Sequence, residues 1–268
     1  MTVKVEMTTG LFAWRRIHSL MGLWLILYLI THLITNSQAT LWLGDDGIGF
    51  VRLVNALESL PYLQVVEIVL IAIPFALHGY WGIKRALVAK ENVGRSDGSH
   101  PSLSYGRNRA FSWQRITSWI LLVGILGHVV QMRFLWAPEE VRANNQIWYT
   151  VHIKDDVGLS SLAERIHVEL EKEGDFVLAK AKSPGKAMLL MVRETFKSPL
   201  WCICYSIFVL AAAFHAFNGF WTSLITWGVL LSYRSQRAFL PVCWVGIFLL
   251  IFLGFAAVWG SYWLNLRN

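Results

Sequence analysis

The sequence predicts an all-α integral membrane protein with five transmembrane helices in one bundle and a small α+β extramembrane insert between the third and fourth helices. Of its 268 residues, 55% are hydrophobic and only 15% are charged, a balance that suits a bilayer better than water. Long apolar segments recur along the chain, and a single charged stretch between them has the alternation of a folded domain. These observations disfavour a soluble globular fold.

The predicted spans follow from the length that a bilayer requires. A helix needs roughly 20 mostly apolar residues to cross a hydrocarbon core of ~30 Å. Five segments meet or approach that length, at residues 14–35, 63–87, 116–136, 200–222 and 241–264. Each should be a helix, because only hydrogen bonds within the segment satisfy the backbone in lipid. No small-residue cleavage site follows the first span, so we expect that helix to be retained.

The charged stretch at residues 138–198 predicts a small domain outside the membrane, between the two parts, 1–137 and 199–268, of the membrane domain. Its apolar spacing predicts a strand over 147–153, a helix over 159–173 and further strands over 176–181 and 188–192. Two histidines of this insert, His152 and His167, are expected to be solvated or structural rather than ligands.

The Lys/Arg distribution predicts the orientation of the chain. The leader, the 84–115 connection and the 223–240 connection together hold twelve Lys/Arg against three acidic residues. The opposite side, with the insert and the C-terminus, holds twelve against thirteen. The positive-inside rule therefore places the N-terminus in the cytoplasm and the C-terminus and insert outside. The net charge of +7 is a topological signal, and no nucleic-acid partner is expected.

Four histidines inside four different spans are the candidate functional residues: His32, His78, His128 and His215. An ionisable residue at membrane depth indicates function by default, although a single histidine can also be an interhelical hydrogen-bond donor. The rise of 1.5 Å per residue places His32 and His128 roughly 20 to 24 Å from the cytoplasmic edge. By the same measure His78 lies roughly 9 Å from that edge, and His215 shares its layer.

Two pairs at two depths match the requirement of two stacked bis-histidine haems, because each iron takes one nitrogen from each of two facing helices. Such iron has no open position, which favours one-electron transfer over oxygen chemistry. Haem propionates also need cations, and four residues at the cytoplasmic helix ends are candidates for that contact: Arg15, Arg16, His18 and Arg115. Ordinary positive-inside anchoring explains each of them equally well.

Short motifs around these residues resemble a known family. The segments are Arg15 to Gly22, Thr31-His32-Leu33, Leu77 to Gly82, Gln114 to Thr117, Gly127-His128-Val129, His215 to Trp221 and Arg234 to Arg237. They resemble the single-chain, two-haem cytochrome b subunit of succinate dehydrogenase and fumarate reductase, the cytochrome b558-like membrane anchor of complex II. The resemblance covers the five spans and their cytoplasmic connections but not the insert.

The resemblance implies two haem b groups, with His78 and His215 as axial ligands of the proximal haem and His32 and His128 of the distal one. It further implies a quinone, usually menaquinone, and a bacterial cytoplasmic membrane. Two soluble partners are implied on the cytoplasmic side, a flavoprotein with FAD and an iron–sulfur subunit. The chain would be the quinone-reacting, electron-transfer subunit, with no succinate active site of its own.

Glu67, on the outer half of the second span, is the candidate proton acceptor or relay for quinol oxidation. A carboxylate that hydrogen-bonds a neighbouring helix explains it equally well. Some relatives have a glutamate two residues before the fourth ligand, where this chain has Ala213. Alternative functions are a quinone-reactive cytochrome b of another respiratory dehydrogenase, a haem-free anchor, or a transporter that uses histidines without haem.

Overall fold

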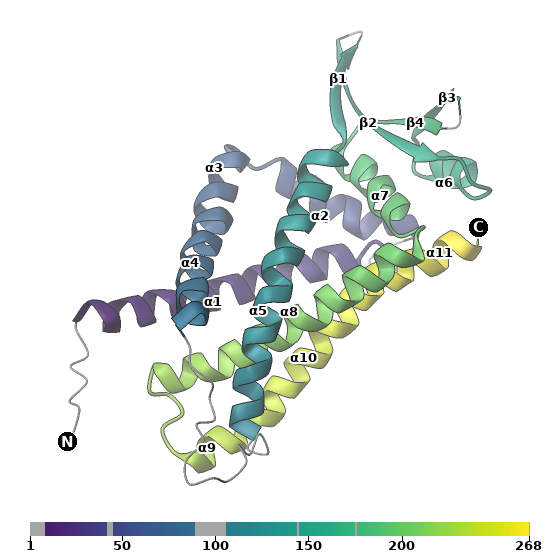
Figure 1. The fold of residues 1–268 in the computed structure, drawn as a ribbon. Coiled ribbons are helices and arrows are strands. Elements are labelled where there is room, and N and C mark those ends of the chain that lie inside the picture. Colours follow the sequence, from purple (N-terminus) through teal and green to yellow (C-terminus); the bar gives the residue numbers. More distant parts are fainter. Residues whose placement is uncertain (1–8, 42–44, 89–105, 144, 175, 268) are drawn as a thin grey trace, which may run out of the picture. The chain divides into compact units, whose positions relative to one another are not determined.

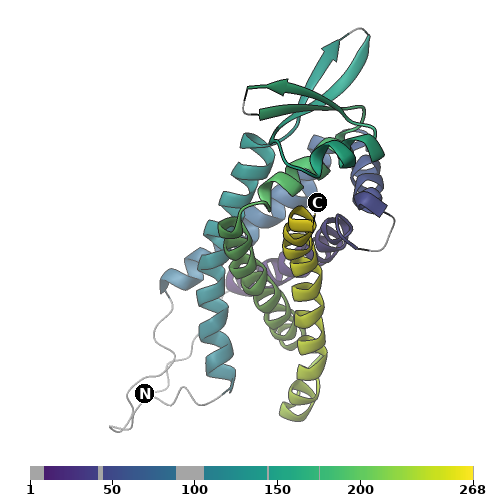
Figure 2. The same cartoon turned by 90° about the vertical axis from the view of Figure 1, so that its right-hand side faces the viewer.

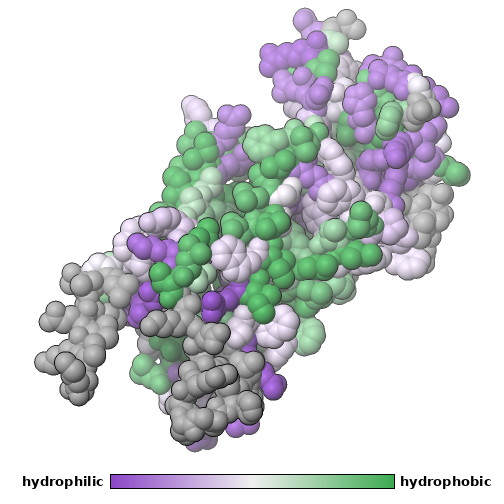
Figure 3. Space-filling model, in the orientation of Figure 1, coloured by the Kyte–Doolittle hydropathy of each residue, from purple (hydrophilic) through white to green (hydrophobic). Residues whose placement is uncertain are grey.

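The computed structural model describes residues 9–41, 45–88, 106–143, 145–174 and 176–267 (Figure 1). The leader before Thr9 and most of the 84–115 connection, with part of the charge count above, lie outside the described residues. Within them, five helices are long and apolar enough to cross a membrane: Phe12–Ser37, Leu63–Val88, Arg109–Leu135, Pro199–Thr226 and Tyr233–Leu264. The five predicted spans are confirmed. Hydrophobic side chains cover these helices, whereas hydrophilic ones gather over the insert (Figure 3).

Two of the spans are interrupted by π-helical turns, and a third span ends in one. The helices of the five spans are α1 (Thr9–Ser37), α3 (Leu63–Glu67) with η2 (Ile68–Ala72) and α4 (Ile73–Val88), α5 (Gly106–Val129) with η3 (Val130–Leu135), α8 (Pro199–Thr226), and α10 (Leu240–Phe255) with η4 (Ala256–Gly260) and α11 (Ser261–Arg267). Single π-helical turns inside α-helices are often found at functional sites. One of them, η2, begins directly after Glu67, and another, η3, begins shortly after His128. Both residues were candidates from the sequence.

The chain divides into two compact units. The first comprises Met1–Leu29, Gln64–Leu122 and Ala211–Phe248, and the second comprises Ile30–Leu63, Val123–Leu210 and Leu249–Asn268. In the first unit Trp221, Leu230 and Cys243 form a small buried cluster. The indole of Trp221 donates a hydrogen bond to the carbonyl of Gln236 (3.0 Å) in the short helix α9 (Tyr233–Ala238). This bond ties α8 to the turn that precedes α10.

The insert, in the second unit, is an antiparallel four-stranded sheet in the order β1-β2-β4-β3 (Figures 1 and 2). The strands are β1 (Glu139–Ala143), β2 (Gln146–Lys154), β3 (Glu169–Glu173) and β4 (Phe176–Ala181). Two helices accompany them, α6 (Leu159–Arg165) and α7 (Pro184–Thr195), and α7 packs against β2 and β4. The predicted strands at 147–153 and 176–181 are confirmed.

Two other predictions inside the insert are wrong. The predicted helix over 159–173 ends at Arg165, because His167 has a left-handed φ of 54°, and the chain then continues as β3. The predicted strand at 188–192 lies inside α7, which begins with Pro184 after Ser183. Proline with its fixed φ suits the first turn of a helix. A short apolar run alone does not separate a strand from a buried helix.

The core of the insert is continuous with other parts of the second unit. Val51 and Phe50 of α2 (Ile48–Glu58) and Cys202 of α8 belong to the same buried cluster as the inner residues of β2, β4, α6 and α7. Gly185 lets α7 approach α2 closely, since a Cβ there would lie 2.6 Å from the carbonyl oxygen of Val51. The proposed domain boundary at 138 and 198 stays a prediction.

Asp156 is the centre of a half-buried ion cluster between β2 and α7. Its carboxylate accepts hydrogen bonds of 2.9 Å from both terminal nitrogens of Arg193 and lies 2.7 Å from Lys197 Nζ. Burial by itself raises the pKa of Asp156, but the hydrogen bonds and charges of the two cations outweigh it and hold that pKa well below its usual range. The ion pairs therefore stabilise the insert fully above the ordinary pKa of about 3.9, and this stabilisation is lost progressively as the pH falls from there through the lowered pKa of the folded state.

We expect Asp156→Asn to lower the free energy of local unfolding of the insert by about 1–3 kcal/mol, less than for a fully buried pair. Hydrogen-exchange protection factors of α7 amides in the full chain, compared between about pH 6 and pH 3, measure this. The wild type should lose protection at the lower pH, and the variant should change less. The exposed Asp155, which pairs with Lys172 at 3.5 Å, provides the control Asp155→Asn. Equal acid sensitivity in wild type and Asp156→Asn would contradict the assignment.

Candidate functional site

In the first unit, the structure brings together His78 of α4 and His215 of α8. Their ring centroids lie 6.3 Å apart, with an angle of 79° between the ring planes. Both side chains are half-buried. These are the two residues that the sequence assigned to one layer.

The His78 ring is held from the side of α1. Its Nδ1 lies 3.1 Å from the backbone carbonyl oxygen of His18, and the His18 ring stacks on it at 4.1 Å. A carbonyl can only accept, so Nδ1 carries the proton and Nε2 is left as the ligand nitrogen. Gly22 makes this approach possible, because a Cβ at that position would lie 2.9 Å from His78 Cε1.

The His215 ring is held from α5. Its Nδ1 lies 3.3 Å from the hydroxyl of Thr117, which itself donates to the carbonyl of Trp113 (2.7 Å). The single hydroxyl proton is thus directed away from the ring, so Thr117 accepts from Nδ1–H. Gln114 also donates a hydrogen bond to the carbonyl of His215 (3.2 Å) and accepts one from Asn218 (2.7 Å). These contacts leave Nε2 of His215 available to a ligand.

In the second unit, His32 of α1 and His128 of α5 face each other. Their ring centroids lie 5.8 Å apart at an interplanar angle of 84°. His128 Nδ1 lies 3.1 Å from the hydroxyl of Tyr205, which donates to Gln131 Oε1 at 3.0 Å. The sequence also assigned His32 and His128 to one layer.

His32 has a different setting from the other three. The side-chain amide of Asn36 donates to the carbonyl of His32 at 2.8 Å, and the same nitrogen lies 3.4 Å from His32 Nε2. The described contact is therefore on Nε2, the nitrogen that the other three rings keep open. Because one Asn36 nitrogen makes both contacts, ligation of a metal through Nε2 of His32 requires this side chain to give up its contact with the ring.

The spacing of each pair can be tested against a haem iron. With metal–nitrogen bonds of about 2.0 Å, as for other metal–imidazole bonds, and a ring centroid about 1.1 Å behind the nitrogen, two imidazoles on one iron have centroids roughly 6 Å apart. The observed separations are 6.3 Å for His78 and His215 and 5.8 Å for His32 and His128. Together with the Nδ1 acceptors of His78, His215 and His128, these spacings fit bis-histidine ligation. Among the described residues, no group of three or more His, Cys, Asp or Glu gathers to hold a metal ion.

Two of the cations that the sequence proposed for propionates, Arg16 and Arg115, have aromatic neighbours in the structure. The guanidinium of Arg16 lies 4.6 Å from the centroid of the Trp227 ring, and that of Arg115 lies 5.9 Å from the centroid of the Phe111 ring. Such cation–π contacts suit helix ends at a membrane interface. The assignment of Arg15, Arg16, His18 and Arg115 to propionates stays a prediction.

Glu67 is the last residue of α3 and directly precedes η2. It is half-buried. In the π-helical turn that follows, the carbonyl of Leu70 accepts a hydrogen bond of 2.6 Å from the indole of Trp24. Glu67 therefore lies at an interruption of the regular helix, and its role as a proton acceptor stays a prediction.

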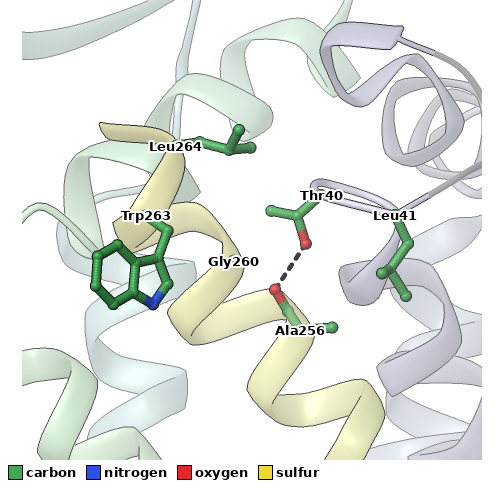
Figure 4. Close-up of a pocket in the computed structure, with 6 residues that line it drawn as sticks. All are labelled: Thr40, Leu41, Ala256, Gly260, Trp263 and Leu264. Carbon is green, nitrogen blue, oxygen red and sulfur yellow. Dashed lines mark hydrogen bonds between the residues drawn. The ribbon is translucent and has the colours of Figure 1, made fainter. Parts of the chain in front are cut away.

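Each of the two units contains a cavity. The first cavity, of about 520 Å³, is lined by Thr40, Leu41, Ala256, Gly260, Trp263 and Leu264 in the second unit (Figure 4). Its hydroxyl group belongs to Thr40 and already donates to the carbonyl of Ala256 at 2.6 Å, so the cavity offers mainly apolar contacts. The other, of about 410 Å³ in the first unit, is bordered by Gln114 and Asn218, which connect it to His215 through hydrogen bonds.

Sequence reasoning missed the residues that orient the histidines. Thr117 falls within one of the quoted motifs, but its contact with His215 was not anticipated. Tyr205 and Gln131 are polar groups inside apolar spans, and that is the signal by which they could have been found.

The five spans and the two facing histidine pairs define the class of the molecule as a multi-pass integral membrane protein with paired histidines in the membrane. The chain is similar to the succinate dehydrogenase cytochrome b558 subunit of Bacillus subtilis (strain 168). The two are 27% identical over 248 residues, which cover 92% of this chain and 95% of that protein. This similarity confirms the resemblance predicted from the motifs. No family model matches the chain, and no solved structure matches it.

Proposed function

We propose that this chain is the dihaem cytochrome b membrane-anchor subunit of a succinate:quinone oxidoreductase, of the succinate dehydrogenase or fumarate reductase type. In this role it passes electrons between membrane quinone and an iron–sulfur subunit. The observation that carries the proposal is the presence of two histidine pairs, each with ring centroids near the spacing of a bis-histidine iron. The similarity to a cytochrome b558 subunit over nearly the whole chain supports it.

When bound, haem b supplies a one-electron carrier whose potential depends on its axial ligands and their hydrogen bonds. The chain's own contribution is to orient the ligands. His78 and His215 hold the proximal haem, and His32 and His128 hold the distal haem. Acceptors on Nδ1 fix the tautomer of three of the four rings.

The Lys/Arg distribution supports a cytoplasmic N-terminus and an outer insert, so the flavoprotein and iron–sulfur partners bind on the side of the leader. A quinone, which the family resemblance implies to be menaquinone, exchanges electrons and protons at the opposite side, where Glu67 is the proposed proton acceptor. Arg15, Arg16, His18 and Arg115 are the proposed contacts of the haem carboxylates on the cytoplasmic side.

The proposal predicts that the full chain, purified in detergent, binds two haem b per polypeptide. A reduced-minus-oxidised spectrum combined with a pyridine haemochrome assay measures both the haem type and the ratio. Affinity purification from the native host should also recover a flavin-containing subunit and an iron–sulfur subunit. Two haems with a flavin-free partner would point to another quinone-reactive dehydrogenase. A purified chain without b-type bands would refute the haem assignment.

A further inference from the structure

Three side chains of the second unit form one hydrogen-bonded chain. The ring of His128 is bonded through Nδ1 to the hydroxyl of Tyr205 (3.1 Å), and that hydroxyl donates to Oε1 of Gln131 (3.0 Å). Gln131 is buried, with 6% of its surface exposed. Tyr205 is further packed against Phe196 and Phe208. The phenol is thus held between the histidine and the amide.

The donor and the acceptor of each of these two hydrogen bonds follow from the protons that the three side chains carry. Tyr205 has one hydroxyl proton, and Gln131 Oε1 can only accept, so that proton lies between these two residues. The hydroxyl oxygen must then accept from His128, whose Nδ1 carries the ring proton. His128 Nε2 is consequently unprotonated and able to bind a metal.

The orientation of the Gln131 amide decides this outcome. Turned by half a rotation, the amide would donate to Tyr205, and the phenol proton would move to the histidine side. His128 would then accept at Nδ1 and carry its proton on Nε2, where it blocks ligation. In the structure Oε1 of Gln131 faces Tyr205. The amide nitrogen of Gln131, Nε2, is buried and has no hydrogen-bond partner among the described residues. Gln131 lies in the π-helical turn η3, where its carbonyl accepts from the amide of Trp136 (2.9 Å).

We infer that Tyr205 and Gln131 are positioning residues that hold His128 in the ligating tautomer and lower the reduction potential of the haem that His128 holds. The inference rests on the proposed function. An acceptor on Nδ1–H increases the electron donation of an imidazole ligand, which favours the ferric state. A phenol that itself donates to an amide carbonyl is polarised and becomes a stronger acceptor. His78 has only a backbone carbonyl in this place, and His215 has a threonine hydroxyl.

The test is a potentiometric titration of the purified full chain, with low-spin ferric EPR signals recorded for each haem. Tyr205→Phe keeps the ring and its packing but removes the acceptor. We expect it to raise the midpoint potential of one haem, the one lost in His128→Ala, by an amount equal to roughly a tenfold change in the reduction equilibrium, ~59 mV for one electron. Gln131→Leu should shift the same haem in the same direction. Gln131→Glu, which keeps an acceptor for the phenol, should shift it less or in the opposite direction.

Thr117→Val is the matched control, because it removes the corresponding acceptor of His215 and should move only the other haem. If Tyr205→Phe and Gln131→Leu both leave the potential and the EPR signal of the His128 haem unchanged, the inference is wrong while the haem assignment stands. If the wild type binds no haem, the proposed function itself fails. Should Tyr205→Phe lose this haem, retention of the other haem shows that the chain is folded and supports the role in ligation. If Tyr205→Phe loses both haems, the potentials measured for Gln131→Leu and Gln131→Glu decide whether the inference holds.

Discussion

Replacement of His128 by alanine is expected to remove one of two haems and to leave the other with its spectrum and potential unchanged. The reason is that a bis-histidine iron depends on both axial nitrogens, and the two pairs lie in different units of the chain. His32→Ala should remove the same haem. His78→Ala and His215→Ala should each remove the other. The haem-to-chain ratio should fall from two to one in every case, as measured by pyridine haemochrome and redox titration.

His152→Ala provides the control for these variants. His152 lies on β2 of the insert with an exposed side chain, 3.8 Å from Glu173, and its removal should leave both haems in place. The pattern of loss is the decisive observation. Variants of His32 and His78 that remove the same haem would overturn the pairing, and so would loss of both haems in a folded chain from any single substitution.

Gly22→Leu is expected to eliminate the haem held by His78 and His215. A Cβ at position 22 would lie 2.9 Å from His78 Cε1 and 3.3 Å from its Nδ1, so a leucine must displace the ring. The ring has little freedom to move, because it is stacked on His18 and bonded to that residue's carbonyl. Gly22→Ala should cause a milder change, seen as a shifted potential or EPR signal of the same haem.

Gly79→Ala is the matched control for this prediction. Gly79 is adjacent to His78 on α4, and a Cβ there meets no atom within 4 Å. An alanine inside a helix is also favoured over glycine by roughly 1 kcal/mol, so this variant should keep both haems and its stability. Unaltered haem content and spectra in Gly22→Leu would show that the close approach of α1 to His78 is not needed for ligation.

The spans could be predicted from sequence because they depend on local properties. Length and apolar composition decide whether a segment can cross a bilayer, and neither requires knowledge of neighbouring helices. Helix ends were less accurate. The third span was expected from residue 116, but α5 already begins at Gly106, since polar residues can continue a helix beyond the apolar core.

The insert shows where local pattern fails. The segment 159–173 has apolar residues at helical spacing, yet it changes to a strand after the left-handed residue His167. In β3, Glu169, Glu171 and Glu173 alternate with Leu170 and Lys172, a period that also suits a strand. The pairing of β3 with β4 decided between the two readings, and a partner strand is not visible in the segment's own sequence.

The membrane class, the five spans and the four intramembrane histidines could be predicted without a structure, because hydropathy and helical rise are properties of single segments. The sequence also predicted which histidines share a depth. The centroid distances of 5.8 and 6.3 Å within the two pairs, and the atom that accepts from Nδ1 in three of the rings, depend instead on how the helices pack. All three acceptors come from another helix than the ring they hold, so the contact between Tyr205 and His128 exists only once α8 and α5 are packed together.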